Sequence, residues 1–114
     1  LEKYGHVLTE HVGKENIRED SEKELTDREI HTRDLEWLKQ SDVLVAEVTT
    51  PSLGVGYEIG RAVEYEKAIL CLHRTNSNAN LSAMIAGCEN LNCNKYSNLK
   101  EAREIIDKFF NRLK

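Results

Sequence analysis

Apolar residues occur along this chain in short runs that alternate with longer stretches of helical spacing. The runs Val43–Val48 and Ala68–Leu72 are apolar except for Glu47, which predicts two strands that are covered on both faces of a sheet. The weakly alternating segment Val7–Val12 predicts a strand before them, and Asn92–Tyr96 predicts a last strand at a sheet edge. The pattern therefore indicates four strands.

The stretches between the strands carry the signals of helices. Thr26 with Glu29 three residues later fits a capping box, which predicts a helix that ends near Gln40. A second helix is expected over Val55–Glu66, because its apolar residues fall on one face. Two more helices, each with an asparagine cap, are predicted further along: residues 81–86 after Asn80, and residues 99–113 after Asn98.

The order of these elements, with strands and helices in alternation, predicts one α/β domain over residues 1–114 with a mostly parallel sheet. The polar stretch Gly13–Lys23 has no hydrophobic period and is expected to be a loop. Ligands of such domains bind beyond the carboxyl ends of the strands. The loops after Val48 and Leu72 are therefore expected to border the functional site.

Composition narrows the class of function. The 114 residues are 39% hydrophobic and 32% charged, within the range of a globular domain with one core. No apolar run is long enough to span a membrane and no signal peptide is visible, so we expect no membrane partner. The net charge of -4, without a block of Lys or Arg, argues against a polymeric nucleic acid as partner but is compatible with a mononucleotide.

The three cysteines, Cys71, Cys88 and Cys93, lack the spacing of a metal site and are odd in number. Cys71 lies in an apolar run and is interpreted as a small buried hydrophobe. The cysteine pattern therefore favours a reducing, intracellular location without a disulfide or a zinc site.

The most informative segment is a loop of Pro, Ser and Gly that follows the run ending at Val48 and leads directly into a helix. Gly54 would let the backbone approach a ligand closely, and the N–H groups at the helix start favour an anion. Ser52 could add a hydroxyl to a phosphate site, and Ser82, near the start of the short helix, could add a second. Glu58 lies in the first turns of the helix, where the helix dipole favours its ionised form.

Asp34 is the candidate partner of Glu58. It lies four residues after Ile30 and four before Leu38, on the apolar side of its helix, where a carboxylate is costly unless it is paired or used. Two carboxylates that flank a glycosidic bond can cleave it, and a retaining mechanism needs them roughly 5 Å apart. The pair therefore predicts glycosidase chemistry next to a phosphate site.

Ordinary structural roles stay open for each of these residues. Glu58 could be a solvated helix residue, Ser52 a turn residue after a proline and Ser82 a first-turn residue of a helix. Three cations could pair with Asp34 instead: Arg33, Lys39 and Arg61. The four histidines show no ligand spacing and are interpreted as structural or solvent-facing. Two tyrosines are interpreted as packing residues: Tyr57 and Tyr65.

Four segments at these spacings resemble the 2'-deoxynucleoside 5'-phosphate N-hydrolases of the nucleoside 2-deoxyribosyltransferase-like superfamily. They are DLEWL (34–38), AEVTTPSLGVGYEIGRAV (46–63), ILCL (69–72) and LSAMI (81–85). The likeness extends from VLTEHV through LSAMI, and over roughly the last 25 residues it holds only in outline. It implies a Rossmann-like, three-layer α/β fold.

The resemblance also implies hydrolysis of the N-glycosidic bond of a 2'-deoxyribonucleoside 5'-monophosphate to the free base and 2-deoxyribose 5-phosphate. By this likeness, Glu58 is the nucleophile, and Asp34 supports the acid/base step and orients the sugar. Ser52, Gly54 and Ser82 bind the phosphate, and Ser82 reaches over from the neighbouring subunit of a homodimer. No metal and no organic cofactor is implied, and the cytoplasm and the nucleus are the expected compartments.

Members of this family begin with another strand and a glycine-rich loop, whereas this chain starts near the end of the helix that follows them. The resemblance therefore implies an N-terminally truncated domain that lacks this first strand, a tyrosine near the sugar and part of the phosphate cradle.

Two other functions stay open, a nucleoside 2-deoxyribosyltransferase and a non-catalytic module that binds a nucleotide. The two serines argue against the transferase, because such enzymes take unphosphorylated nucleosides. A ribonucleotide phosphoribohydrolase would carry a PGGxGTxxE-type loop, which this sequence lacks.

Overall fold

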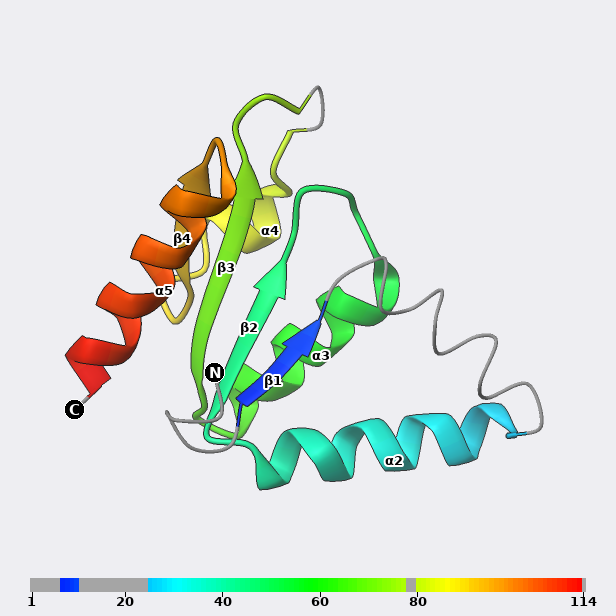
Figure 1. Cartoon of the computed structure of the whole chain (residues 1–114). Coiled ribbons are helices and arrows are strands. Elements are labelled where there is room, and N and C mark those ends of the chain that lie inside the picture. The colour runs from blue at the N-terminus through cyan, green and yellow to red at the C-terminus, as the bar shows by residue number, and fades with distance from the viewer. Residues whose placement is uncertain (1–6, 11–24, 78–79, 114) are drawn as a thin grey trace.

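The computed structural model describes residues 7–10, 25–77 and 80–113. Four parallel strands form one sheet in the order β1-β2-β3-β4 (Figure 1). The strands are β1 (Val7–Glu10), β2 (Val43–Glu47), β3 (Ala68–Arg74) and β4 (Asn92–Tyr96). Because every strand is parallel to its neighbours, the carboxyl ends of the four strands lie at one edge of the sheet.

The described helices are α2 (Asp27–Gln40), α3 (Leu53–Glu64), α4 (Ala83–Ala86) and α5 (Leu99–Leu113). The predicted capping box of α2 is confirmed: Thr26 Oγ1 accepts from the N–H of Glu29 at 3.1 Å, and Glu29 Oε1 accepts from the N–H of Thr26 at 3.0 Å. The predicted cap of α5 is confirmed as well, because Asn98 Oδ1 accepts from the N–H of Glu101 at 2.9 Å.

The sheet has a buried core on each face, which confirms the three-layer arrangement. The first core joins the sheet to α2 and α3, and its buried residues are Leu35, Leu38, Leu44, Ala46, Val55, Ile59, Ala62, Ile69 and Cys71. The second joins the opposite face to α5, and its buried residues are Val43, Val45, Leu70, Leu72, Phe109 and Phe110. Because successive residues of β2 alternate between the two cores, this strand is covered on both faces, as its apolar run predicts.

Helix boundaries differ from the prediction where a serine caps the helix. α3 begins at Leu53 rather than at Val55, because the Ser52 hydroxyl accepts from the N–H of Val55 at 3.3 Å and starts the helix two residues earlier. α4 is capped by Ser82 rather than by Asn80, so it begins three residues after the predicted cap. Both corrections concern loops that the sequence identifies as candidate binding segments.

Strand boundaries also differ in detail. β3 ends at Arg74 instead of Leu72, and its pairing with β4 extends to that residue. β1 ends at Glu10, and the rest of the predicted first strand (11–12) and the predicted loop (13–23) lie outside the described residues. Cys71 is fully buried, which confirms its interpretation as a small core residue, and burial raises the pKa of its thiol to about 12.

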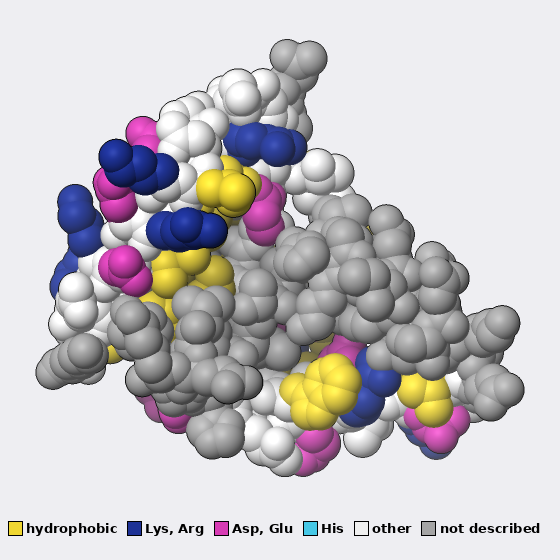
Figure 2. All heavy atoms as spheres, in the orientation of Figure 1, with side chains coloured by type: hydrophobic (Ala, Val, Ile, Leu, Met, Phe, Trp, Pro, Cys, Tyr) yellow, Lys and Arg dark blue, Asp and Glu magenta, His cyan; other side chains and the backbone are white. Residues whose placement is uncertain are grey.

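The described helices include none that is long and apolar enough to cross a membrane. Over α5, basic and acidic side chains are interspersed (Figure 2). The charged residues of this helix are Lys100, Glu101, Arg103, Glu104, Asp107, Lys108 and Arg112. A surface of mixed charge differs from the single-sign stripe that a nucleic acid backbone selects.

Candidate active site

Two cavities lie at the N-terminal end of α3, and different faces of that helix line them. The first, the carboxylate cavity, has a volume of about 210 Å³ and is lined by Asp27, Ile30, His31, Asp34, Leu35, Gly54, Tyr57 and Glu58. The second, the serine cavity, has a volume of about 380 Å³ and is lined by Val48, Thr50, Pro51, Ser52, Leu53, Val55, Gly56, Ile59, Asn80, Leu81, Ser82, Met84 and Ile85. Both lie where the sequence predicts the site, around the loop that follows β2.

The carboxylate cavity brings together Asp34 from α2 and Glu58 from α3, the two predicted catalytic residues. Both side chains are buried, with 7% of Asp34 and 5% of Glu58 exposed. The two helices pack on the same face of the sheet, so residues on their facing sides are withdrawn from solvent. The alternative in which Glu58 is a solvated helix residue is therefore wrong.

Asp34 pairs with its sequence neighbour Arg33, which is one of the three cations that the sequence left open. Arg33 Nη2 lies 3.0 Å from Asp34 Oδ1, and Arg33 Nε lies 3.3 Å from the same oxygen. The guanidinium of Arg33 also lies over the Trp37 ring, 4.4 Å from its centroid. Arg61, another of the three cations, pairs with Glu64 at 3.0 Å. The Arg33 contact holds the Asp34 carboxylate at the cavity wall.

A histidine and a tyrosine meet at the mouth of the carboxylate cavity. His31 Nε2 and the Tyr57 hydroxyl oxygen lie 2.8 Å apart, and the ring centroids are 5.4 Å apart. His31 is solvent-facing, as predicted, but Tyr57 is 49% exposed and lines the cavity instead of packing in the core. The sequence signal was their placement: His31 precedes Asp34 by one helical turn, and Tyr57 is adjacent to Glu58.

The serine cavity brings together Ser52 and Ser82, the two serines predicted to bind phosphate. Each is the N-cap of a helix, and the Ser82 hydroxyl accepts from the N–H of Met84 at 3.2 Å. Helix capping is a structural role that both serines fulfil without a ligand. It also places a hydroxyl at the start of α3, where the N–H groups and the helix dipole favour an anion.

Gly54 lies in the carboxylate cavity, whereas Ser52 lies in the serine cavity. The two residues are two positions apart, which is about 200° of rotation around a helix axis, so they point to different sides of α3. The clamp that the sequence predicts at Ser52 and Gly54 is thus divided between neighbouring cavities. Ser82 lines the serine cavity of its own chain, and its role in a neighbouring subunit stays a prediction.

The two cavities together offer buried carboxylates beside the N-terminus of a helix. Such an arrangement suits nucleophilic and acid/base chemistry on a small molecule that carries an anionic group. Within residues 7–10, 25–77 and 80–113, no group of three or more His, Cys, Asp and Glu side chains is arranged to hold a metal ion.

Comparison with known families and proteins identifies relatives over most of the chain. The family model described as nucleoside 2-deoxyribosyltransferase matches residues 1–104. A 5-hydroxymethyl-dUMP N-hydrolase of Danio rerio is 48% identical over 115 residues, which cover 99% of this chain and 80% of that protein. Proteins of the same name from Tetraodon nigroviridis and Homo sapiens are 56% and 58% identical, over 79% and 76% of this chain. The chain spans 64% and 51% of the length of these two relatives.

A solved structure of similar fold is a CMP N-glycosidase of Clostridium botulinum. It superimposes with a TM-score of 0.69 over 90% of this chain and 98% of its own, at 22% sequence identity. At that identity the likeness concerns the fold, and it agrees with the α/β architecture described above.

Proposed function

The chain belongs to the nucleoside 2-deoxyribosyltransferase family, and from that premise we propose that it takes part in hydrolysis of the N-glycosidic bond of 2'-deoxyribonucleoside 5'-monophosphates. The products are the free base and 2-deoxyribose 5-phosphate. The observation that carries this proposal is the meeting of Asp34 and Glu58, both buried, in one cavity next to the N-terminus of α3. The names of the curated relatives, 5-hydroxymethyl-dUMP N-hydrolases, support the same bond and the same phosphorylated substrate class.

In the proposed reaction, Glu58 is the nucleophile. A carboxylate oxygen of Glu58 forms a bond to the anomeric carbon as the bond from that carbon to the base nitrogen breaks, and the base leaves with the electron pair and takes up a proton. Water then attacks the anomeric carbon and releases Glu58, with retention of configuration after two displacements. A negative charge next to the anomeric carbon stabilises the oxocarbenium-like transition state.

Asp34 is the proposed acid/base residue and also orients the sugar. Its carboxylate is held by Arg33 at the wall of the cavity that contains Glu58, so both groups can face one sugar ring. A catalytic group gains from such fixation, because misplacement by roughly 1 Å can cost a hundredfold in rate.

The phosphate is proposed to bind around the start of α3. Ser52 supplies a hydroxyl from the serine cavity, Gly54 supplies backbone on the side of the carboxylate cavity, and Ser82 of the neighbouring protomer supplies a second hydroxyl. An anion in this place is favoured by the N–H groups and the dipole of α3. Binding energy at the phosphate, remote from the reacting bond, would align the sugar with Glu58.

The working unit is proposed to be a homodimer, with Ser82 of each protomer completing the phosphate site of the other. Two large apolar side chains on the rim of the serine cavity support an interface there, because Leu53 is 96% exposed and Met84 is 83% exposed.

Met84→Glu should shift the sedimentation of the protein from dimer to monomer and reduce activity. A wild-type protein that sediments as a monomer at assay concentrations would overturn the dimer.

The proposed compartment is the reducing interior of the cell, the cytoplasm or the nucleus, where nucleotides occur. The three cysteines are unbridged, and the buried position of Cys71 supports a chain whose thiols stay reduced.

Product analysis tests the reaction. The full chain is incubated with deoxy- and ribonucleoside monophosphates, 5-hydroxymethyl-dUMP among them, and released base is separated from nucleotide. We expect base release from deoxynucleotides and a loss of roughly three orders of magnitude or more in Glu58→Gln. The matched control is Glu64→Gln, on the same helix, because Glu64 is exposed and its pair with Arg61 contributes little.

The same assay separates the two other candidate functions. If a second free base is added and a new nucleotide forms, the protein is a deoxyribosyltransferase. If wild type and Glu58→Gln both bind nucleotide and neither releases base, the protein is a binding module and the hydrolase proposal fails.

A further inference from the structure

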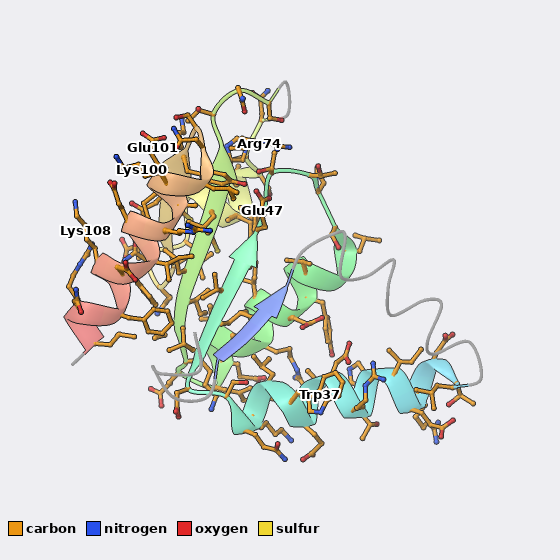
Figure 3. All side chains as sticks on the ribbon, viewed as in Figure 1. Trp37, Glu47, Arg74, Lys100, Glu101 and Lys108 are labelled. Atoms are coloured by element: carbon orange, nitrogen blue, oxygen red, sulfur yellow. The ribbon has the colours of Figure 1, made fainter. Side chains whose placement is uncertain are left out.

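A hydrogen-bonded network joins the carboxyl ends of β2, β3 and β4. Figure 3 shows Glu47 at the end of β2 and Arg74 at the end of β3, at the same edge of the sheet. Tyr96 is the last residue of β4 and pairs in register with Arg74. Thr49 lies two residues beyond the end of β2 and is only 4% exposed.

The carboxylate of Glu47 is the centre of this network. Its Oε1 accepts from the backbone N–H of Thr49 at 2.7 Å, and its Oε2 accepts from the Thr49 hydroxyl at 2.7 Å. The Tyr96 hydroxyl also donates to Oε2 of Glu47. The hydroxyl oxygen of Thr49 in turn accepts from the backbone N–H of Arg74 at 2.8 Å. Glu47 and Thr49 thereby join the carboxyl ends of β2, β3 and β4.

Thr49 is also the base of the loop that leads into α3. Its two neighbours, Val48 and Thr50, line the serine cavity, and Ser52 follows two residues after Thr50. Tyr96 packs against the second core, which joins the sheet to α5, and contacts the Glu47 carboxylate. Neither Glu47 nor Tyr96 is among the residues that line the two cavities. The network therefore holds the loop by its first residues without itself lining either cavity.

We propose that Glu47 and Tyr96 are positioning residues for phosphate binding, which fix the loop from Thr49 to Ser52 in the geometry that presents the Ser52 hydroxyl and the start of α3 to the substrate. This inference rests on the proposed function and adds two residues that do not touch the substrate. A carboxylate that accepts hydrogen bonds from a backbone N–H and two hydroxyls restrains a turn more strongly than neutral hydrogen bonds do. Loosening the turn should weaken binding at the phosphate more than the step at the sugar.

The test compares Tyr96→Phe with wild type on a deoxynucleoside monophosphate and on the corresponding deoxynucleoside. Loss of one hydrogen bond to Glu47 should raise the KM for the monophosphate roughly two- to tenfold, with kcat changed less than twofold. The KM for the unphosphorylated nucleoside should stay the same. A general loss of structure would move both substrates together, so the ratio of the two KM values reports positioning alone.

Two controls keep the test specific. Tyr65→Phe removes a hydroxyl from another partly buried tyrosine, which packs against the α2/α3-side core, and should leave both KM values unchanged. Thr49→Val removes the hydroxyl between Glu47 and Arg74 and should act like Tyr96→Phe, whereas Thr49→Ser keeps that hydroxyl and should restore wild-type KM.

Unchanged monophosphate KM in both Tyr96→Phe and Thr49→Val would overturn the inference. So would an equal rise in KM for nucleotide and nucleoside. If wild type releases no base, the proposed function fails on its own, and calorimetric binding of the monophosphate then tests the inference. In that case weaker binding in Tyr96→Phe supports the positioning role, and equal binding overturns it.

Discussion

The carboxylate cavity and the serine cavity share the start of α3, but different features of the chain build them. In the carboxylate cavity, the chemistry comes from side chains of two helices, Asp34 and Glu58, which tertiary packing buries. In the serine cavity, it comes from two helix N-termini with capping hydroxyls, and the rim carries the exposed Leu53 and Met84. The proposed reactive groups thus depend on how helices pack within one chain, whereas the proposed anion-binding groups depend on local cap geometry beside exposed apolar side chains.

The largest effect should come from the carboxylate cavity. Asp34→Asn is expected to lower kcat by roughly 10²–10⁴-fold, because it removes the proposed acid/base group, with little change in KM. The double variant with Glu58→Gln should be no slower than Glu58→Gln alone, since groups that act as a unit are not additive. Steady-state kinetics of base release measure both. Glu36→Gln, an exposed residue of α2, is the matched control, and an equal loss there would remove Asp34 from the chemistry.

The next effect should come from the serine cavity and should appear in KM. Ser82→Ala is expected to weaken phosphate binding by about 1.5–3 kcal/mol, the range for a hydrogen bond to a charged group. Ser82→Thr keeps both the hydroxyl and the helix cap and should retain most of the affinity.

Mixing two defective variants shows which subunit supplies Ser82. Glu58→Gln and Ser82→Ala protomers should together recover activity if the serine acts across a dimer, because one site of the mixed dimer then has both native residues. If Ser82 acts within its own chain, the mixture releases base no faster than the two variants do separately. That result would mean that the serine cavity, like the carboxylate cavity, is built from residues of a single chain.

A smaller effect, on the free energy of unfolding at alkaline pH, should come from Tyr96 in the network next to the serine cavity. Burial, and next the hydrogen bond to Glu47 and the charge of that carboxylate, raise the pKa of the Tyr96 hydroxyl. The hydroxyl therefore stabilises the fold fully below the ordinary tyrosine pKa of about 10, and the contribution is lost as the pH rises through the raised pKa. Urea unfolding measures the free energy of unfolding at pH 8 and above pH 10. Between these two pH values it should fall further for wild type than for Tyr96→Phe. An equal fall in both proteins would contradict the role of this hydroxyl.

The smallest effect should come from the start of α2, one wall of the carboxylate cavity. Thr26→Ala removes the capping box and should lower the free energy of unfolding by about 1 kcal/mol. Because Asp27 in the first turn lines the cavity, kcat should fall severalfold more than in Asn98→Ala, which removes a cap from the distant α5. Circular dichroism during urea unfolding and base-release kinetics give the two quantities. Equal kinetics in the two variants would mean that this wall is irrelevant to the site.

Local pattern predicted the elements of the fold because burial follows periodicity. The apolar run of β2 predicted a strand covered on both faces, and the two cores on its alternate residues confirm it. The position of Asp34 on the apolar side of α2 likewise predicted its burial. The start of α3 was misplaced, because the choice of Ser52 as cap depends on backbone angles that residue types alone do not determine.

Side-chain contacts between segments that are far apart in the chain could not be predicted from the sequence. His31 and Tyr57 are 26 positions apart, and Glu47 and Tyr96 are 49 positions apart. The spacing of His31 to Asp34 and of Tyr57 to Glu58 places the first two residues near the site, but their mutual contact depends on how α2 packs against α3. The contact between Glu47 and Tyr96 depends on the order of the strands in the sheet, which no motif in the sequence determines. Arg33 was one of three equal candidates for Asp34 until the geometry selected it.

The parallel sheet with strands in sequence order has a consequence for folding. Each described strand after β1 pairs with the strand before it, through one crossover, so native contacts form between near neighbours along the chain. Such a topology lets the β2–α3–β3 unit form early and serve as the template for the rest. Ser52, Gly54 and Glu58 all lie in this unit. Amide hydrogens of β2 and β3 should therefore exchange with solvent most slowly, and the proposed nucleophile would be carried by the most persistent part of the chain.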